Sequence, residues 1–163
     1  MTISNDFIQK KYLKIIRGNL IWSRDLEHLE VLKHGYLVIE QGICHGTYAC
    51  LPDIYAGLSV ADYGDRLIIP GLIDLHLHAS QYAFRGLGMD MELIEWLNVN
   101  TFPEEAKYAD LEYAKRAYTQ FTENLRRGAT TRACVFATQH REATELLMDL
   151  LEESGLKTMV GKV

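Results

Sequence analysis

The sequence predicts an α/β protein in which a small β-rich segment precedes a parallel sheet flanked by helices. Two observations predict this fold class. Residues 7–69 consist of short apolar and β-branched runs separated by Gly, Asn and Asp, which supply turns. After Pro70-Gly71, strand-like and helix-like patterns alternate with short connections, as they do in βα units. We therefore expect two domains, residues 1–69 and residues 70–163.

The β-rich segment is expected to form a small sheet or sandwich and not a barrel. Residues 12–16 and 18–22 predict either a strand pair or one bent strand. Further candidate strands, of which the second is the weakest, are residues 35–39, 46–49 and 64–69.

The second half begins with an alternating strand at residues 72–78. A short helix at 91–97 is followed by a long amphipathic helix at 110–127, capped by Gly128. The apolar face expected for the long helix comprises Leu111, Ala114, Tyr118, Phe121 and Leu125. The remaining expected elements are a strand at 130–136, a helix at 142–153 and a strand at 156–163. This pattern alone fits a doubly wound sheet or part of a barrel.

Composition excludes several classes of function. The 163 residues are 48% hydrophobic and carry a net charge of −5, which argues against a nucleic-acid partner. No apolar run reaches the ~20 residues of a membrane span, and the first residues do not form a signal peptide. Cys44, Cys50 and Cys134 lack metal or redox spacing, so we interpret them as small buried thiols in a reducing compartment. These observations predict a cytoplasmic protein.

His76 and His78 are the residues that carry chemistry. They are spaced i, i+2 on a strand, so they share a face with Asp74, and their Cβ atoms lie about 6 to 7 Å apart. The opposite face would hold Ile73, Leu75 and Leu77. Two imidazoles at that separation can converge on one ion at Zn–N distances of roughly 2.0 to 2.1 Å. The alternative is a pair of polar residues without metal, which is favoured for an arbitrary His-x-His because a catalytic site needs three ligands and water.

The surrounding sequence favours the metal. Ile69-Pro-Gly-Leu-Ile-Asp-Leu-His-Leu-His78 resembles the opening of amidohydrolase-superfamily enzymes. Within that superfamily, several segments across residues 64–163 are similar to guanine deaminases. They are His78-Ala-Ser-Gln-Tyr82, Leu93-Ile-Glu-Trp-Leu97, Thr101-Phe-Pro103, Gly128-Ala-Thr-Thr131, Phe136-Ala-Thr-Gln-His140 and Val160-Gly-Lys-Val163.

The resemblance implies a (β/α)8 TIM-like barrel, of which residues 70–163 would supply the first three or so βα units. Residues 1–69 would be an incomplete part of a small β-sandwich domain. It further implies that His76 and His78 bind one zinc ion and that Gln81 hydrogen-bonds a purine. The alternative role for Gln81 is that of a loop cap. The family's third histidine, aspartate and proton-carrying glutamate have no counterpart here, so we expect no catalytic residue in this chain. The chain is then expected to be the N-terminal portion of a longer enzyme.

The implied reaction is hydrolytic deamination of guanine to xanthine and ammonia, performed by a full-length homodimer. Alone, the chain is expected to be inactive and to bind zinc weakly. The alternatives are another amidohydrolase, such as a chlorohydrolase or a deaminase of another purine or pyrimidine, and a non-catalytic interaction module.

Four further residues are interpreted more simply. Trp96 is expected to pack in the core rather than close the pocket, and Asp74 to hold the end of its strand. For His140, a supporting or surface position is as good an interpretation as a place in the site. Lys162 is interpreted as structural.

Overall fold

The computed structural model describes residues 12–163, and these divide into two compact units between Pro70 and Gly71. The predicted β-rich segment starts at residue 7, so its first five residues lie outside the described part. Within residues 12–163, none of the helices has the length and apolar character needed to cross a membrane.

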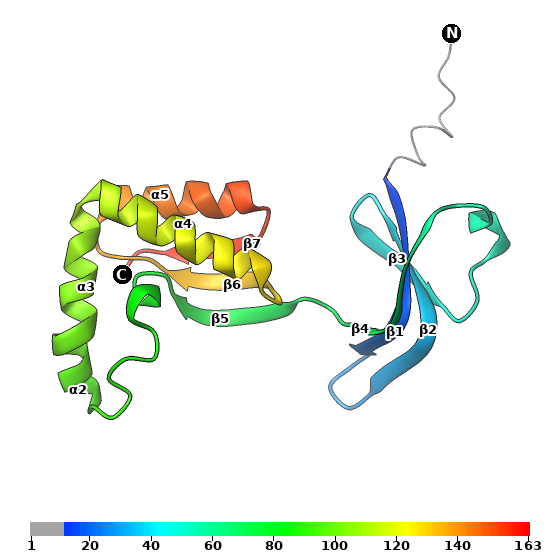
Figure 1. Ribbon diagram of the computed structural model, residues 1–163, viewed down its shortest axis with the longest axis horizontal. Coiled ribbons are helices and arrows are strands. Elements are labelled where there is room, and N and C mark those ends of the chain that lie inside the picture. The colour runs from blue at the N-terminus through cyan, green and yellow to red at the C-terminus, as the bar shows by residue number, and fades with distance from the viewer. Residues whose placement is uncertain (1–11) are drawn as a thin grey trace, which may run out of the picture. The chain divides into compact units, whose positions relative to one another are not determined.

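The first unit is a single four-stranded sheet in the order β3-β2-β1-β4 (Figure 1). Its strands are β1 (Leu13–Ser23), β2 (Leu29–Glu40), β3 (Ile43–Tyr48) and β4 (Val60–Ile68). β1 pairs antiparallel with β2 and parallel with β4. β1 is the predicted bent strand, because its register with β2 shifts between Gly18 and Leu20. The described residues of this first unit form one sheet, so the sandwich stays a prediction.

β2 begins at Leu29, six residues before the strand expected at 35–39. The early part forms a hairpin with β1, in which Ile21 pairs with Val31. An aspartate makes the turn: the Asp25 carboxylate accepts hydrogen bonds from the backbone N–H groups of Glu27 and His28. The core of the unit is small and centres on Ile15, Val38 and Tyr55.

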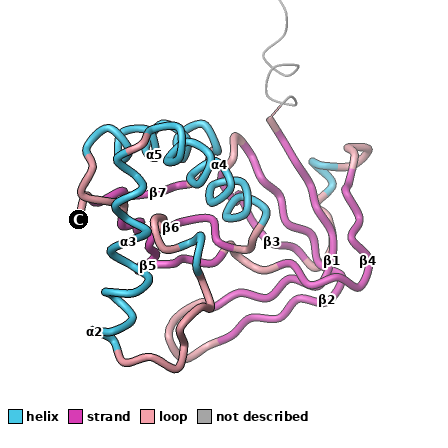
Figure 2. Tube along the Cα trace, turned by 60° about the vertical axis from the view of Figure 1, so that its left-hand side comes forward, coloured by secondary structure: helices cyan, strands magenta, loops and turns pink. Residues whose placement is uncertain are grey.

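The second unit is a three-stranded parallel sheet in the order β5-β6-β7, with α4 and α5 on one face (Figures 1 and 2). Its strands are β5 (Leu72–His78), β6 (Thr130–Phe136) and β7 (Lys157–Gly161), and its two long helices are α4 (Leu111–Arg127) and α5 (Arg141–Ser154). Between β5 and α4 the chain forms α2 (Leu93–Trp96), a π-helical turn (Leu97–Thr101) and α3 (Phe102–Ala106). The α/β class predicted from the sequence is confirmed.

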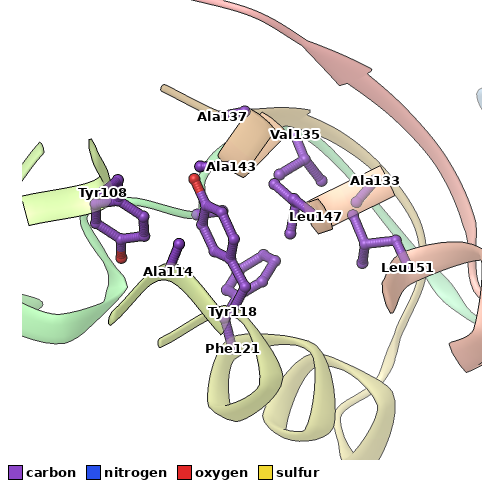
Figure 3. Packing of buried hydrophobic residues seen from close by; sticks show 11 residues of the cluster. Tyr108, Ala114, Tyr118, Phe121, Ala133, Val135, Ala137, Ala143, Leu147 and Leu151 are labelled. Carbon is purple, nitrogen blue, oxygen red and sulfur yellow. The ribbon is translucent and has the colours of Figure 1, made fainter. Parts of the chain in front are cut away.

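Helix and sheet meet in one apolar cluster (Figure 3). Tyr118 and Phe121 from α4 and Leu147 and Leu151 from α5 pack against Val135 of β6, and all five are essentially inaccessible to solvent. α4 begins where the Asp110 carboxylate accepts hydrogen bonds from the N–H groups of its first turn, and it ends at Gly128 as predicted. α5 ends at Gly155, which adopts a φ of +78°.

The apolar face expected for the long helix is wrong at Leu111, and two apolar residues of β5 are also exposed. Leu111 is 42% exposed, because it is the first residue of α4 and precedes the part of the helix that packs on the sheet. Ile73 and Leu75 are 61% and 70% exposed, although Leu77 on the same strand packs into the core. The core cluster of the second unit, against which Leu77 packs, contains neither Ile73 nor Leu75.

The cysteines also differ from the expectation of buried thiols. Cys44 and Cys50 are exposed, since β3 is the edge strand of its sheet and residue 50 lies just after it. Cys134 on β6 is partly buried, and all three are free thiols.

Candidate metal-binding and active site

His76 and His78 lie at the C-terminal end of β5 with their side chains together. Their Nε2 atoms are 3.1 Å apart and their ring centroids 5.0 Å apart. Two nitrogens bound to one zinc at roughly 2.05 Å and separated by this distance would subtend an angle of about 98°, near the tetrahedral value. The pair therefore fits a shared ion. Without metal, the same geometry allows one imidazole to donate a hydrogen bond to the other.

Asp74 fixes the backbone at the first of the two histidines. Its Oδ1 accepts a hydrogen bond of 3.0 Å from the N–H of His76. The pairing of β5 with β6 is irregular between Asp74 and Leu77, and within this stretch the carboxylate provides an acceptor for the N–H of His76. This agrees with the interpretation that Asp74 holds the end of its strand.

Phe136 forms an aromatic wall beside both histidines. Its ring stacks on His78 with centroids 4.8 Å apart and an interplanar angle of 18°, and it is tilted against His76 at 5.1 Å. The register explains the contact, because Phe136 of β6 lies directly opposite His78 of β5. Sequence reasoning placed Phe136 on the second strand and missed this role.

The surroundings of His78 favour its neutral form. Burial lowers its pKa, the neighbouring His76 lowers it further, and the Glu105 carboxylate opposes both. A neutral imidazole is the species that binds zinc. Its Nδ1 is buried and has no hydrogen-bond partner among the described residues, an unsatisfied group at the edge of the candidate site.

The loop after β5 carries Gln81, the predicted purine-binding residue. Gln81 precedes a 3₁₀ turn, Tyr82–Phe84, but its side chain makes no capping hydrogen bond there. The alternative role as a loop cap is therefore not supported, and the amide keeps its donors and acceptor for another partner. Its neighbour Ser80 is fully buried and donates a 2.8 Å hydrogen bond to Glu105 of α3.

His140 and Lys162 do not join the histidine pair. His140 is the N-cap residue of α5. It lines an open hollow of about 450 Å³ together with Tyr108, Leu111 and Arg141, and no residue that lines this hollow is a predicted metal ligand. Lys162 is exposed just after β7, and nothing in the structure supports a structural role for it.

Trp96 anchors the segment between β5 and α4. Its Nε1–H donates a 3.0 Å hydrogen bond to the carbonyl oxygen of Leu87, and its ring centroid lies 5.4 Å from that of Phe84. The side chain is half-buried, so it packs against this local segment and not in the main core.

The candidate site is a half-site. Across residues 12–163, no group of three or more His, Cys, Asp or Glu side chains is arranged to hold a metal ion. The two imidazoles, the aromatic wall and the unbonded amide of Gln81 are what the described chain offers.

Residues 67–163 match the family model described as "Amidohydrolase family". The chain belongs to this family. It is 34% identical to a guanine deaminase of Dictyostelium discoideum over 170 residues, which cover 94% of this chain and 38% of that protein. It also superposes, with a TM-score of 0.87 and 43% identity, on a crystal structure of guanine deaminase from C. acetobutylicum with bound guanine in the active site. That match covers 91% of this chain and 36% of the other.

A hydrolase of lower sequence identity shares the fold. A triazine hydrolase variant superposes with a TM-score of 0.74 at 15% identity, covering 93% of this chain and 35% of the other. The chain thus spans less than two fifths of the length of each of these three proteins.

Proposed function

We propose that this chain supplies the first part of a zinc-dependent guanine deaminase, which hydrolyses guanine to xanthine and ammonia. The observation that carries the proposal is the 3.1 Å approach of the Nε2 atoms of His76 and His78 within an amidohydrolase motif. The substrate is inferred from the guanine deaminases at 34% and 43% identity. The fold is proposed to be the start of a (β/α)8 barrel, preceded by part of a β-sandwich.

Each residue has a defined part in this reaction. His76 and His78 would hold the ion, which supplies Lewis acidity and a water of lowered pKa when bound. Gln81 would hydrogen-bond the purine, since its amide presents donors and an acceptor in one plane. Phe136 would help to keep the two rings in place, since it packs against both of them. Glu105 is engaged with Ser80, so the carboxylate that carries a proton to the leaving amine would come from elsewhere.

The remaining ligands would come from polypeptide beyond these 163 residues, either a continuation of this chain or a second chain. A different amidohydrolase activity is the second candidate, because the family match over residues 67–163 does not specify the substrate. The higher identity of the guanine deaminases favours guanine over that alternative. A non-catalytic module would make no use of the convergent imidazoles.

A chimera tests the proposal. This chain would replace the matching segment of the C. acetobutylicum guanine deaminase, to which it is 43% identical. With zinc, the chimera is expected to convert guanine to xanthine, the His76→Ala chimera to lose both activity and bound zinc, and the isolated chain to show no turnover. A folded, zinc-loaded chimera that acts on another amine or on a chlorotriazine, but not on guanine, would establish the second candidate. Guanine turnover by the isolated chain would contradict the half-site.

The cytoplasm is the proposed location, supported by three free thiols in the described residues. A homodimer of the whole enzyme stays a prediction. Size measurement of the active chimera would test it.

A further inference from the structure

Ser80 is the point at which three elements of the second unit meet. Its Oγ donates to Oε1 of Glu105 at 2.8 Å and lies 3.3 Å from the carbonyl oxygen of Ala137, just after β6. Its own carbonyl oxygen accepts a 3.3 Å hydrogen bond from the hydroxyl of Tyr108. A serine hydroxyl carries one hydrogen, so the shorter contact to the carboxylate is the dominant one.

The helix that carries Glu105 is anchored by hydrogen bonds of its own. Glu105 lies on α3, and the adjacent Glu104 is buried and bonded to both the Lys107 ammonium and the Tyr113 hydroxyl. The two acids therefore divide their roles. Glu104 ties α3 to the start of α4, and Glu105 reaches across to the loop after β5.

In the sequence, Ser80 lies between the proposed ligand His78 and the proposed purine-binding residue Gln81. The loop backbone is further fixed where the N–H of Ala79 donates to the carbonyl oxygen of Phe136 at 3.0 Å. Gln81 thus combines a held backbone with a side chain that makes no capping bond. Recognition of a planar base benefits from such an arrangement, since a free amide on a mobile loop would lose ordering entropy on binding.

We propose that Glu105, acting through Ser80, is a positioning residue that fixes the loop 79–81 and so holds Gln81 in place for a purine. The part concerning Gln81 rests on the proposed guanine deaminase function. The part concerning the loop rests only on the hydrogen bonds of the described chain.

Amide hydrogen exchange on the complete 163-residue chain tests the loop directly, without zinc or guanine. Glu105→Ala is expected to speed exchange at the amides of Ala79 and Tyr82 about tenfold, the factor that corresponds to one lost hydrogen bond to a charged group. Glu105→Gln keeps an acceptor for Ser80 and is expected to limit the increase to about threefold. Glu95→Ala, on exposed α2, is the matched control and should leave both rates unchanged.

Unchanged rates at both amides in Glu105→Ala would overturn the proposal. So would an equal increase at Ala133 in the core of β6, since this would show general destabilisation and not a loosened loop. Because this test needs no activity, it stands even if the guanine chimera fails.

In the chimera, the link to Gln81 is tested by a double-mutant cycle on guanine kinetics. Glu105→Ala and Gln81→Ala are each expected to raise KM about tenfold with a smaller effect on kcat, and the double variant to be no worse than either by more than about twofold. Effects that multiply in the double variant would show that Glu105 acts independently of Gln81 and would overturn the link.

Discussion

Substitution of Leu147 by alanine provides a sharp test of the packing that supports β5 and β6. Leu147 is 0% exposed at the centre of the cluster formed by α4, α5 and the parallel sheet (Figure 3). Truncation of a fully buried leucine removes transfer free energy and leaves a cavity, at a cost of about 2 to 5 kcal/mol. A unit of this size has a total stability of about 5 to 14 kcal/mol, so the loss would be a large fraction of it.

The assay is thermal unfolding followed by far-ultraviolet circular dichroism. The signal reports mainly on the second unit, because both long helices lie there. A loss of about 3 kcal/mol corresponds to a decrease in Tm of about 12 to 24 °C for a domain of this size.

Leu111→Ala is the matched control, since it makes the same change at a leucine that is 42% exposed. Its cost should stay within about 0.5 kcal/mol. Equal decreases in Tm for the two variants would refute the assignment of Leu147 to the core.

Three further predictions concern local structure. In the metal-free chain, the lowered pKa of His78 means that the unfolded state binds a proton more readily than the folded state. The free energy of unfolding should therefore fall as the pH drops below about 6.5. In urea titrations at several pH values, His78→Gln should make this dependence on pH weaker. Burial and the hydrogen bond to Glu104 raise the pKa of Tyr113 to about 12, so its phenol should ionise near that pH, and Glu104→Gln should return it toward 10 in a spectrophotometric titration. Gly155→Ala should cost about 1 kcal/mol because φ is +78°, whereas Gly161→Ala, where the added Cβ likewise meets nothing within 4 Å, should be nearly neutral; equal losses in urea unfolding would contradict the role of the backbone angle.

Much of the second unit could be predicted because its pattern is local. The strand at 72–78 follows from alternation, and the helix near 110–127 follows from its apolar spacing and a closing glycine. The early part of β2, residues 29–34, was missed because its apolar and charged residues do not alternate regularly, and the strand is established only by pairing with β1. Likewise, α3 was missed although Pro103 lies near its start, where proline is tolerated.

The candidate site shows the same division. The spacing of His76 and His78 predicts that their rings come together, and the 3.1 Å approach agrees with that geometry. Glu105 and Phe136 were missed, since one contacts Ser80 across 25 positions of sequence and the other depends on strand register. No local pattern encodes either contact.

The order of the strands has a consequence for how the chain folds during synthesis. In the second unit, spatial order follows chain order, so β6 with its helix can dock on β5, and β7 on β6, as each leaves the ribosome. In the first unit, the consecutive antiparallel strands β1, β2 and β3 can pair in the same way, but β4 then pairs with β1, for example Arg17 with Asp62. The last strand of the second unit is therefore added next to the strand made just before it, whereas the last strand of the first unit is added at the opposite edge of the sheet from β3.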